Sequence, residues 1–196
     1  KGSIIAPEGI DLTELLNIIN KGQKIENYKK SSSSPFDAEY LIDNVETDII
    51  VEVTYTNIQT GEPATTYIKK AIKRGRHVVT SNKGPIALYY HELKNLADKN
   101  KVYLKFEGTV MSGSPVFNLV YNSFQGNEIL GVKGILNGTT NFILTKMEEG
   151  LDYEQALKLA QELGYAEADP TADVEGYDAL AKIVILSNVL LGGKIK

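Results

Sequence analysis

The sequence alternates between strand-like and helix-like patterns over most of its length, and this alternation constrains the fold more than any other feature. The first complete cycle has an apolar segment at residues 48–53, which predicts a short buried strand. An amphipathic segment at 63–74, ended by Gly75, and a second apolar segment at 76–80 follow it. A strand, helix, strand order is typical of βαβ units, whose strands lie parallel in one sheet. We therefore expect an α/β fold.

The pattern continues for another cycle and then becomes mainly helical. The further predicted elements are helices at 85–97, 115–124, 140–149, 153–163 and 174–191, the last of them strongly apolar, and strands at 102–107 and 129–136. Near the N-terminus, Asp11 three residues before Glu14 predicts a capping box that opens a helix, whereas residues 21–35, with four consecutive serines, predict a loop. We place the boundary between a nucleotide-binding domain, residues 1–112, and a catalytic domain, residues 113–196, in a glycine- and serine-rich segment.

The composition excludes several classes of protein. The chain of 196 residues has no cysteine, so it has no disulfide, thiolate metal site or cysteine nucleophile, and a reducing compartment such as the cytoplasm is indicated. Only Arg74 and Arg76 are arginines, and the net charge is −4, which disfavours nucleic acid as a partner. The richest apolar run, at 183–191, is far shorter than the roughly 20 residues of a membrane span. We therefore expect neither nucleic acid nor a membrane as partner.

The last predicted helix places a charged pair among apolar residues. Asp178 and Lys182 are four residues apart and share a helix face, where such pairs are usually exposed and contribute about a few tenths of a kcal/mol. Here apolar residues fill positions 179–181 and 183–186, so we expect a helix that is buried nearly all round. A buried ammonium is costly unless an anion pairs with it, and lysines held in this way exchange protons. We therefore predict a functional role for Lys182.

An acidic loop at 164–173 leads to this helix. Its carboxylates, among them Glu167 and Asp173, suit either solvated helix caps or the binding of a substrate ammonium group, and for Asp173 we leave the two interpretations open.

Two other loops follow predicted strands, where open α/β sheets bind ligands. Residues 80–85, which include Lys83, suit either an exposed turn or contacts to a phosphate, a nicotinamide ribose or a substrate carboxylate. Residues 107–115 suit either an ordinary turn or a cation site made of oxygen ligands. The chain has no GxGxxG pattern, so the residues by themselves support no dinucleotide fingerprint.

Six motifs follow one another in the order and spacing of one enzyme family. They are 53–57 (VTYTN), 80–85 (TSNKGP), 107–115 (EGTVMSGSP), 134–142 (GILNGTTNF), 164–170 (GYAEADP) and 176–182 (GYDALAK). Over residues 50–192 the chain resembles homoserine dehydrogenases. The resemblance implies NAD(P)-dependent interconversion of L-homoserine and L-aspartate 4-semialdehyde, on the route to threonine, methionine and isoleucine. It also implies a nucleotide-binding domain joined to a catalytic, dimerising domain, and hence a homodimer.

The resemblance assigns roles residue by residue. Lys182 matches the proton-transferring lysine, and Lys83 matches a catalytic lysine near both cofactor and substrate. The residues that match substrate-binding positions are Glu167, Asp178, Asp173, Thr139 and Gly138. Those that match cofactor-binding positions, for NADP or NAD, are Thr54, Thr56, Asn57, Ser81, Lys83 and Gly164. Glu107 and the backbone oxygens of Val110, Ser112 and Ser114 match a sodium-type site.

The resemblance also shows where this chain differs from its family. The first strand and phosphate loop of the nucleotide-binding domain, and the C-terminal part of the catalytic domain, have no counterpart here, so we expect a fragment. The alternative interpretation is a non-catalytic remnant or a partner subunit of the same fold. Aspartate-semialdehyde dehydrogenase, a neighbour in chemistry, needs a cysteine nucleophile that this chain lacks.

Overall fold

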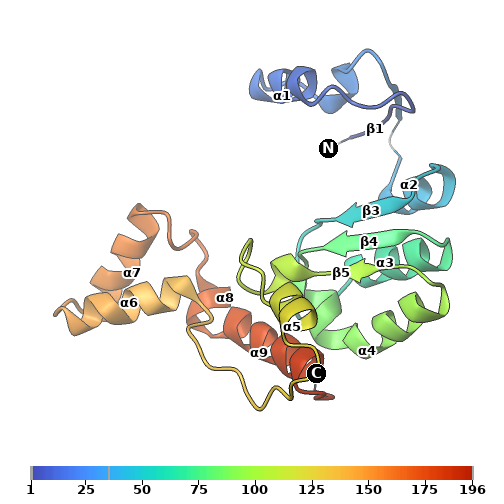
Figure 1. Cartoon of the computed structure of the whole chain (residues 1–196). Helices are drawn as coiled ribbons and strands as arrows, with labels where there is room; N and C mark the ends of the chain where they lie inside the picture. The colour runs from blue at the N-terminus through green and yellow to red at the C-terminus, as the bar shows by residue number, and fades with distance from the viewer. Residues whose placement is uncertain (1, 35, 196) are drawn as a thin grey trace.

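Three parallel strands form the main sheet, in a computed structural model that describes residues 2–34 and 36–195. In order across the sheet, the strands are β3 (Ile49–Glu52), β4 (His77–Thr80) and β5 (Leu104–Lys105). Helices α3 (Ala64–Lys73) and α4 (Lys83–Lys99) connect consecutive strands (Figure 1). Parallel strands joined by helices are the βαβ arrangement, so the predicted α/β fold is confirmed.

Strand β3 is an edge strand of the described sheet. Its register pairs Glu52 with Thr80, the last residue of β4, so the loops after both strands begin side by side. Ile49 and Val51 are 52% and 64% exposed, so the expected full burial of this strand is wrong. The reason is that β3 has a neighbour on one side only within the described residues.

The main core lies between the sheet helices and the last long helix, α9 (Tyr177–Leu190), which packs along α4. Ile68 of α3, Ile86 of α4 and Ile185 of α9 are all fully buried there. Burying such a side chain contributes about 1.5–3 kcal/mol. The core therefore takes residues from both sides of position 112 and anchors α9 to the sheet.

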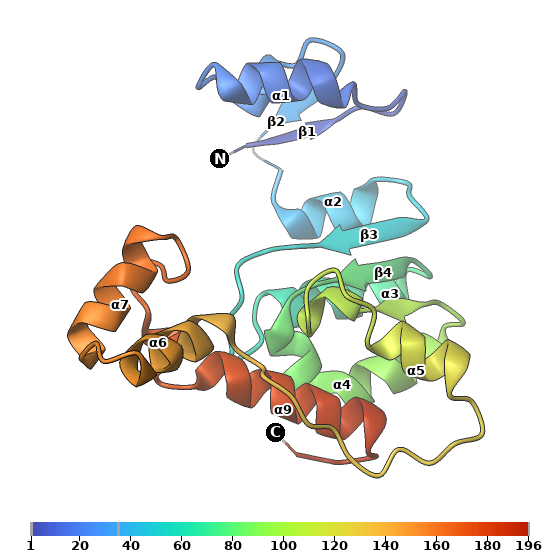
Figure 2. The same cartoon turned by 60° about the vertical axis from the view of Figure 1, so that its left-hand side comes forward.

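A second, smaller core holds a helical pair together. It joins α6 (Gly138–Glu148) to α7 (Tyr153–Glu162) through Ile143, Ala156 and Ala160. Figure 2 shows this pair projecting to one side of the sheet.

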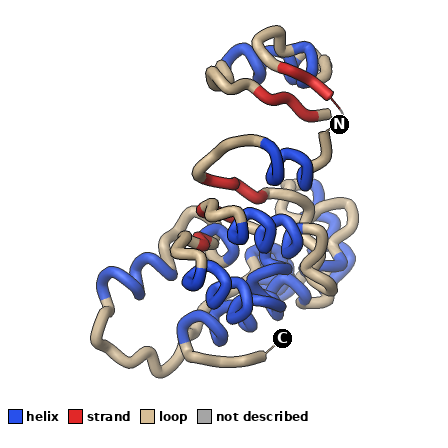
Figure 3. The backbone as a smooth tube through the Cα atoms, turned by 90° about the vertical axis from the view of Figure 1, so that its right-hand side faces the viewer, coloured by secondary structure: helices blue, strands red, loops and turns tan. Residues whose placement is uncertain are grey.

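The N-terminal residues form a small unit at the opposite end of the molecule from the C-terminus (Figure 3). It contains the antiparallel strands β1 (Ser3–Ile5) and β2 (Ser32–Ser34), with α1 (Leu12–Asn20) between them, and α2 (Ala38–Asn44) follows. Asp11 caps α1 by accepting from the N–H groups of Thr13 and Glu14, as predicted. The predicted capping box does not form, because the Asp11 N–H donates to the Tyr28 hydroxyl at 2.9 Å rather than to Glu14.

The prediction of a loop at residues 21–35 is partly wrong. It contains a 3₁₀ turn, Ile25–Asn27, and strand β2, which is part of the serine run, while Pro35 lies outside the described residues. The sequence does not predict this strand, because consecutive serines show no alternation of apolar and polar residues. The strand is defined by its backbone pairing with β1.

Three predictions for the C-terminal half are also wrong. The segment predicted as a strand at 129–136 is irregular, and Leu130 and Ile135 are 86% and 71% exposed, so its β-forming residues have no partner strand among those described. The helix predicted at 174–191 is divided at Gly176, where φ is +79°, into a short turn, α8 (Thr171–Val174), and α9. Helix α9 is buried on one side only, since Leu180 and Ile183 are about half exposed.

The predicted helix at 115–124 is α5 (Phe117–Ser123).

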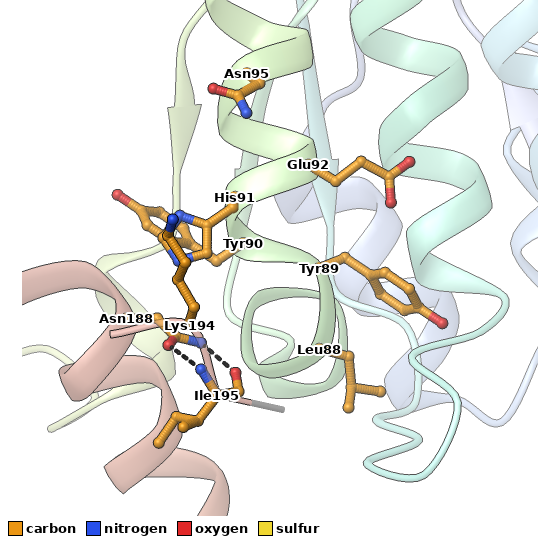
Figure 4. Close-up of a pocket in the computed structure, with 9 residues that line it drawn as sticks. All are labelled: Leu88, Tyr89, Tyr90, His91, Glu92, Asn95, Asn188, Lys194 and Ile195. Atoms are coloured by element: carbon orange, nitrogen blue, oxygen red, sulfur yellow. Dashed lines mark hydrogen bonds between the residues drawn. The ribbon is translucent and has the colours of Figure 1, made fainter. Parts of the chain in front are cut away.

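The last described residues pack against α4 and α9. Asn188 exchanges two hydrogen bonds with the backbone of Ile195, at 3.0 and 2.7 Å (Figure 4). The ring of His91 lies 2.7 Å from the carbonyl oxygen of Gly193. His91, Asn188 and Ile195 border a cavity of about 470 Å³. Within the described part of the chain, no helix has the length and apolar character needed to cross a bilayer.

Candidate active site

A buried carboxylate joins the ends of strands β3 and β4. Glu52, 4% exposed, accepts hydrogen bonds from the backbone N–H of Thr54 at 2.7 Å, from the Thr54 hydroxyl at 2.5 Å and from the Thr80 hydroxyl at 2.8 Å. Glu52 is not among the residues predicted for the site. Its contacts hold the loop after β3 against the loop after β4.

The first turn of α4 is fixed against the same loop. Asn82 caps α4 by accepting from the Gly84 N–H at 3.3 Å, and its amide donates to the Thr54 carbonyl oxygen at 3.3 Å. A Cβ atom on Gly84 would lie 2.3 Å from the carbonyl oxygen of Asn57, so only glycine fits here without a backbone shift. Lys83 is therefore held at a defined place beside the loop after β3.

The other predicted cofactor residues lie on these two loops. Thr56 and Asn57 follow β3, where the Asn57 carboxamide oxygen accepts from the N–H groups of Gln59 and Thr60, both at 3.0 Å. Ser81 is exposed between Thr80 and the cap of α4.

Helices α4 and α9 place two lysines beside one carboxylate. Lys182 Nζ donates to Asp178 Oδ2 at 2.6 Å, and Lys83 Nζ lies 3.3 Å from Asp178 Oδ1. Lys182 also donates to the carbonyl oxygen of Leu136 at 2.6 Å. The side chains of Lys83, Asp178 and Lys182 are 26%, 14% and 17% exposed. We call these three residues the charge cluster.

The charge cluster keeps Asp178 ionised. Burial raises the pKa of Asp178, but hydrogen bonds from Lys182 and Asn137 and the charges of Lys83 and Lys182 outweigh burial, so the pKa is lower than its ordinary value of 3.8. The carboxylate therefore stays an anion over the physiological range.

Asn137 joins the charge cluster to a second carboxylate. Its Nδ2 donates to Asp178 Oδ2 at 2.9 Å and to Asp173 Oδ1 at 2.6 Å, and the residue is 7% exposed. Asn137 caps α6 and Gly138 is the first residue of that helix. Asp173 is therefore connected to the charge cluster by a shared hydrogen-bond donor, the Asn137 amide.

Three predicted residues lie near α6 and α7 with other contacts. The Thr139 hydroxyl donates to the Tyr165 carbonyl oxygen at 2.7 Å, and Gly164 ends α7 with a φ of +78°. The carboxylate of Glu167 is exposed, and within the described residues it has no hydrogen bond or ion pair with the charge cluster. The structure therefore brings Asp173 to the cluster but not Glu167.

Of the predicted cation residues, Glu107 caps a helix in this structure. The Glu107 carboxylate accepts from the N–H groups of Phe117 at 2.8 Å and Asn118 at 3.0 Å, at the start of α5. Val110 is buried, and Ser112 and Ser114 are exposed. Throughout the part of the chain that the structure describes, no three His, Cys, Asp or Glu side chains are grouped as a metal ion would require.

Two family matches cover most of the chain. Residues 10–107 match the family "Homoserine dehydrogenase, NAD binding domain", and residues 115–196 match the family "Homoserine dehydrogenase".

Individual proteins agree with these matches. The chain is 49% identical over 192 residues to the homoserine dehydrogenase of Methanocaldococcus jannaschii. The aligned residues cover 97% of this chain and 57% of that protein. It is also 49% identical to the NAD(+)-dependent homoserine dehydrogenase of Pseudomonas canavaninivorans, with 99% of this chain and 55% of that protein covered. The chain thus spans a little over half the length of these relatives.

Solved structures lead to the same family. A hyperthermophilic archaeal homoserine dehydrogenase in complex with NADPH superposes with a TM-score of 0.84 at 36% identity, over 94% of this chain and 56% of that one. The homoserine dehydrogenase of Thiobacillus denitrificans superposes with a TM-score of 0.74 at 40% identity, over 82% of this chain and 36% of that one. With both family matches and these identities, the chain belongs to the homoserine dehydrogenase family.

Proposed function

We propose that the protein is an NAD(P)-dependent oxidoreductase that interconverts L-homoserine and L-aspartate 4-semialdehyde, with Lys182 as the proton-transferring group. The observation that carries this proposal is the charge cluster. It places a largely buried ammonium group beside the loops at the carboxyl ends of β3 and β4, where α/β sheets of this type bind their ligands.

The loops at these strand ends suit a nicotinamide cofactor. Gly84 allows the loop after β3 to approach the first turn of α4 closely, and Lys83 extends from that turn. When bound, NAD(P) supplies the hydride acceptor or donor. The residues that would hold it are Thr54, Thr56, Asn57, Ser81, Lys83 and Gly164.

Lys182 has the contacts expected of a proton-transfer group. Two of its three N–H donors are used by Asp178 and by the Leu136 carbonyl oxygen, which leaves one for a substrate oxygen. In the reductive direction Lys182 gives a proton to the carbonyl oxygen of the semialdehyde, and in the oxidative direction neutral Lys182 takes the hydroxyl proton of homoserine. Such general acid–base help is worth about 10²–10⁴-fold in rate.

The acidic residues around Lys182 suit the ammonium group of an amino-acid substrate. We assign Asp173 and Asp178 to substrate binding on this ground and Glu167 on the family resemblance, with Gly138 and Thr139, in the first turn of α6, lining the pocket. Lys83 positions the substrate relative to the nicotinamide.

Other parts of the proposal come from the family resemblance. They are a homodimer, a cytoplasmic location, a place in threonine, methionine and isoleucine synthesis, and a sodium-type site at Glu107, Val110, Ser112 and Ser114. Sedimentation of the full-length protein tests the homodimer.

The direct test is an absorbance assay at the nicotinamide band, with homoserine and either NAD or NADP, on the full-length protein. We expect homoserine-dependent formation of NADH or NADPH. If homoserine changes the absorbance with neither cofactor, the proposal is wrong and the chain belongs to a non-catalytic member of the fold.

A further inference from the structure

The carboxamide of Asn137 has each of its hydrogen-bonding groups in use, which defines its orientation. Its Oδ1 accepts from the Thr140 N–H at 2.8 Å and from the Thr140 hydroxyl at 3.0 Å, while its Nδ2 donates to Asp173 at 2.6 Å and to Asp178 at 2.9 Å. Turning the amide over would bring its oxygen against two carboxylates and its N–H₂ group against an N–H donor. The contacts therefore permit one orientation.

This orientation connects three elements at the charge cluster. Asn137 caps α6, Asp173 lies on α8 and Asp178 lies on α9, and the preceding residue, Leu136, supplies the carbonyl oxygen that holds Lys182. Both contacts of Lys182 therefore depend on the segment at 136–137, one directly and one through Asp178.

We infer that Asn137 is a positioning residue for the charge cluster, which holds Asp178 in the orientation that lets it pair with Lys182 through one oxygen and with Lys83 through the other. The inference deepens the proposed function and rests on it for its kinetic readout. Without the amide, Asp173 and Asp178 would face one another as two like charges with no donor between them. The groups that face Asp178 are Lys182 on its own helix, Lys83 of α4, Asn137 of the α6 cap and, through Asn137, Asp173 of α8.

Two substitutions separate this role from helix capping. Asn137→Ser keeps a capping oxygen but loses both N–H donors, and Asn137→Asp keeps the cap while placing a third carboxylate against the other two. The matched control is Asp152→Ala, which removes the cap of the neighbouring helix α7 and touches none of the charge cluster.

The kinetic test measures kcat of the full-length enzyme against pH. Misplacing a catalytic group by about 1 Å costs about 10²-fold, so we expect kcat to fall about 10- to 100-fold in Asn137→Ser, and further in Asn137→Asp near neutral pH. The Asn137→Asp defect should shrink between about pH 8 and pH 6, because crowded carboxylates take up a proton that can replace the missing donor. Asp152→Ala should keep the wild-type kcat and pH profile. Asn137 variants with wild-type kcat, or a defect of Asn137→Asp that is constant with pH, would overturn the inference.

A second measurement does not depend on activity. The melting temperatures of Asn137→Ser, Asp178→Ala and the double variant form a double-mutant cycle. We expect the double variant to lose less than the sum of the single losses, because each substitution removes the same hydrogen bond. Additive losses contradict the role of Asn137, whereas a wild-type enzyme that does not oxidise homoserine contradicts the proposed function alone.

Discussion

Asp178 is the anion that pairs with both lysines of the charge cluster. It pairs with Lys83 and Lys182 and accepts a further hydrogen bond from Asn137, so one carboxylate compensates two cations that are largely withdrawn from water. Removing one partner of a buried ion pair costs about 3–5 kcal/mol, and the partial exposure of these groups places the cost of Asp178→Asn at or below about 3 kcal/mol.

The stability contributed by Asp178 depends on pH in a definite direction. Because its pKa in the folded chain is lower than the ordinary 3.8, the ionised form stabilises the folded state above that pH, and the contribution is lost as the pH falls through the folded pKa. The difference in melting temperature between wild type and Asp178→Asn should therefore be largest near neutral pH and narrow below about pH 4. A difference that stays constant down to about pH 2 would show that Asp178 is not held as an anion.

The sequence predicts some residues of the site and not others, for physical reasons. The spacing of Asp178 and Lys182 on one helix is a local signal, and the pair forms as expected. Asn137 is 36 and 41 residues away from the carboxylates that it contacts, so no local pattern connects them. Glu52 ends an apolar strand, and only the parallel pairing with β4 brings Thr80 to it.

At the scale of elements, Gly176 separates α8 from α9. Its φ of +79° is in the left-handed region, and a Cβ atom there would meet nothing within 4 Å, so the cost of a side chain is purely conformational. We expect Gly176→Ala to lower the free energy of unfolding by about 1–2 kcal/mol in a urea titration. Gly134→Ala, which adds a Cβ atom in open space without a positive φ, is the control and should change little.

Gly84 tests whether the loop after β3 must lie against α4. Its added Cβ atom would meet backbone, the Asn57 carbonyl oxygen at 2.3 Å, which a side-chain rotation cannot relieve. Gly84→Ala should therefore displace the proposed cofactor loop and raise the Kd for NADPH by about 10-fold or more, a change of about 1.4 kcal/mol. Unchanged NADPH binding in fluorescence titrations would mean that this loop does not contribute to the cofactor site.

The elements that sequence patterns miss are those defined by a partner. Strand β2 exists through its backbone pairing with β1, and the apolar residues at 129–136 form no strand in the structure, where no described strand pairs with them. The apolar residues of α9 predict the helix but not which of its sides is buried. Apolar residues occupy both sides, and Leu180 and Ile183 lie on the exposed one.

At the scale of the whole molecule, the reactive group is attached to the main core. Lys182 lies on α9 between the core residues Ala181 and Val184, and α9 packs on α4, whose first residue is Lys83. The same packing that joins the two halves of the chain therefore sets the separation of the two lysines. A rigid element holds a catalytic group more accurately than a mobile loop does.

The most direct test of the account is the kcat of Lys182→Ala in the full-length protein, measured with homoserine and the preferred cofactor. We predict a fall of about 10²–10⁴-fold with the Kd for NADPH unchanged, because the substitution removes the proton-transfer group and leaves the cofactor loops intact. Lys158→Ala, at a lysine whose side chain is 78% exposed on α7, is the matched control and should behave as wild type. A Lys182→Ala enzyme whose kcat stays within about threefold of wild type would contradict the central claim, because general acid–base help is worth far more than that.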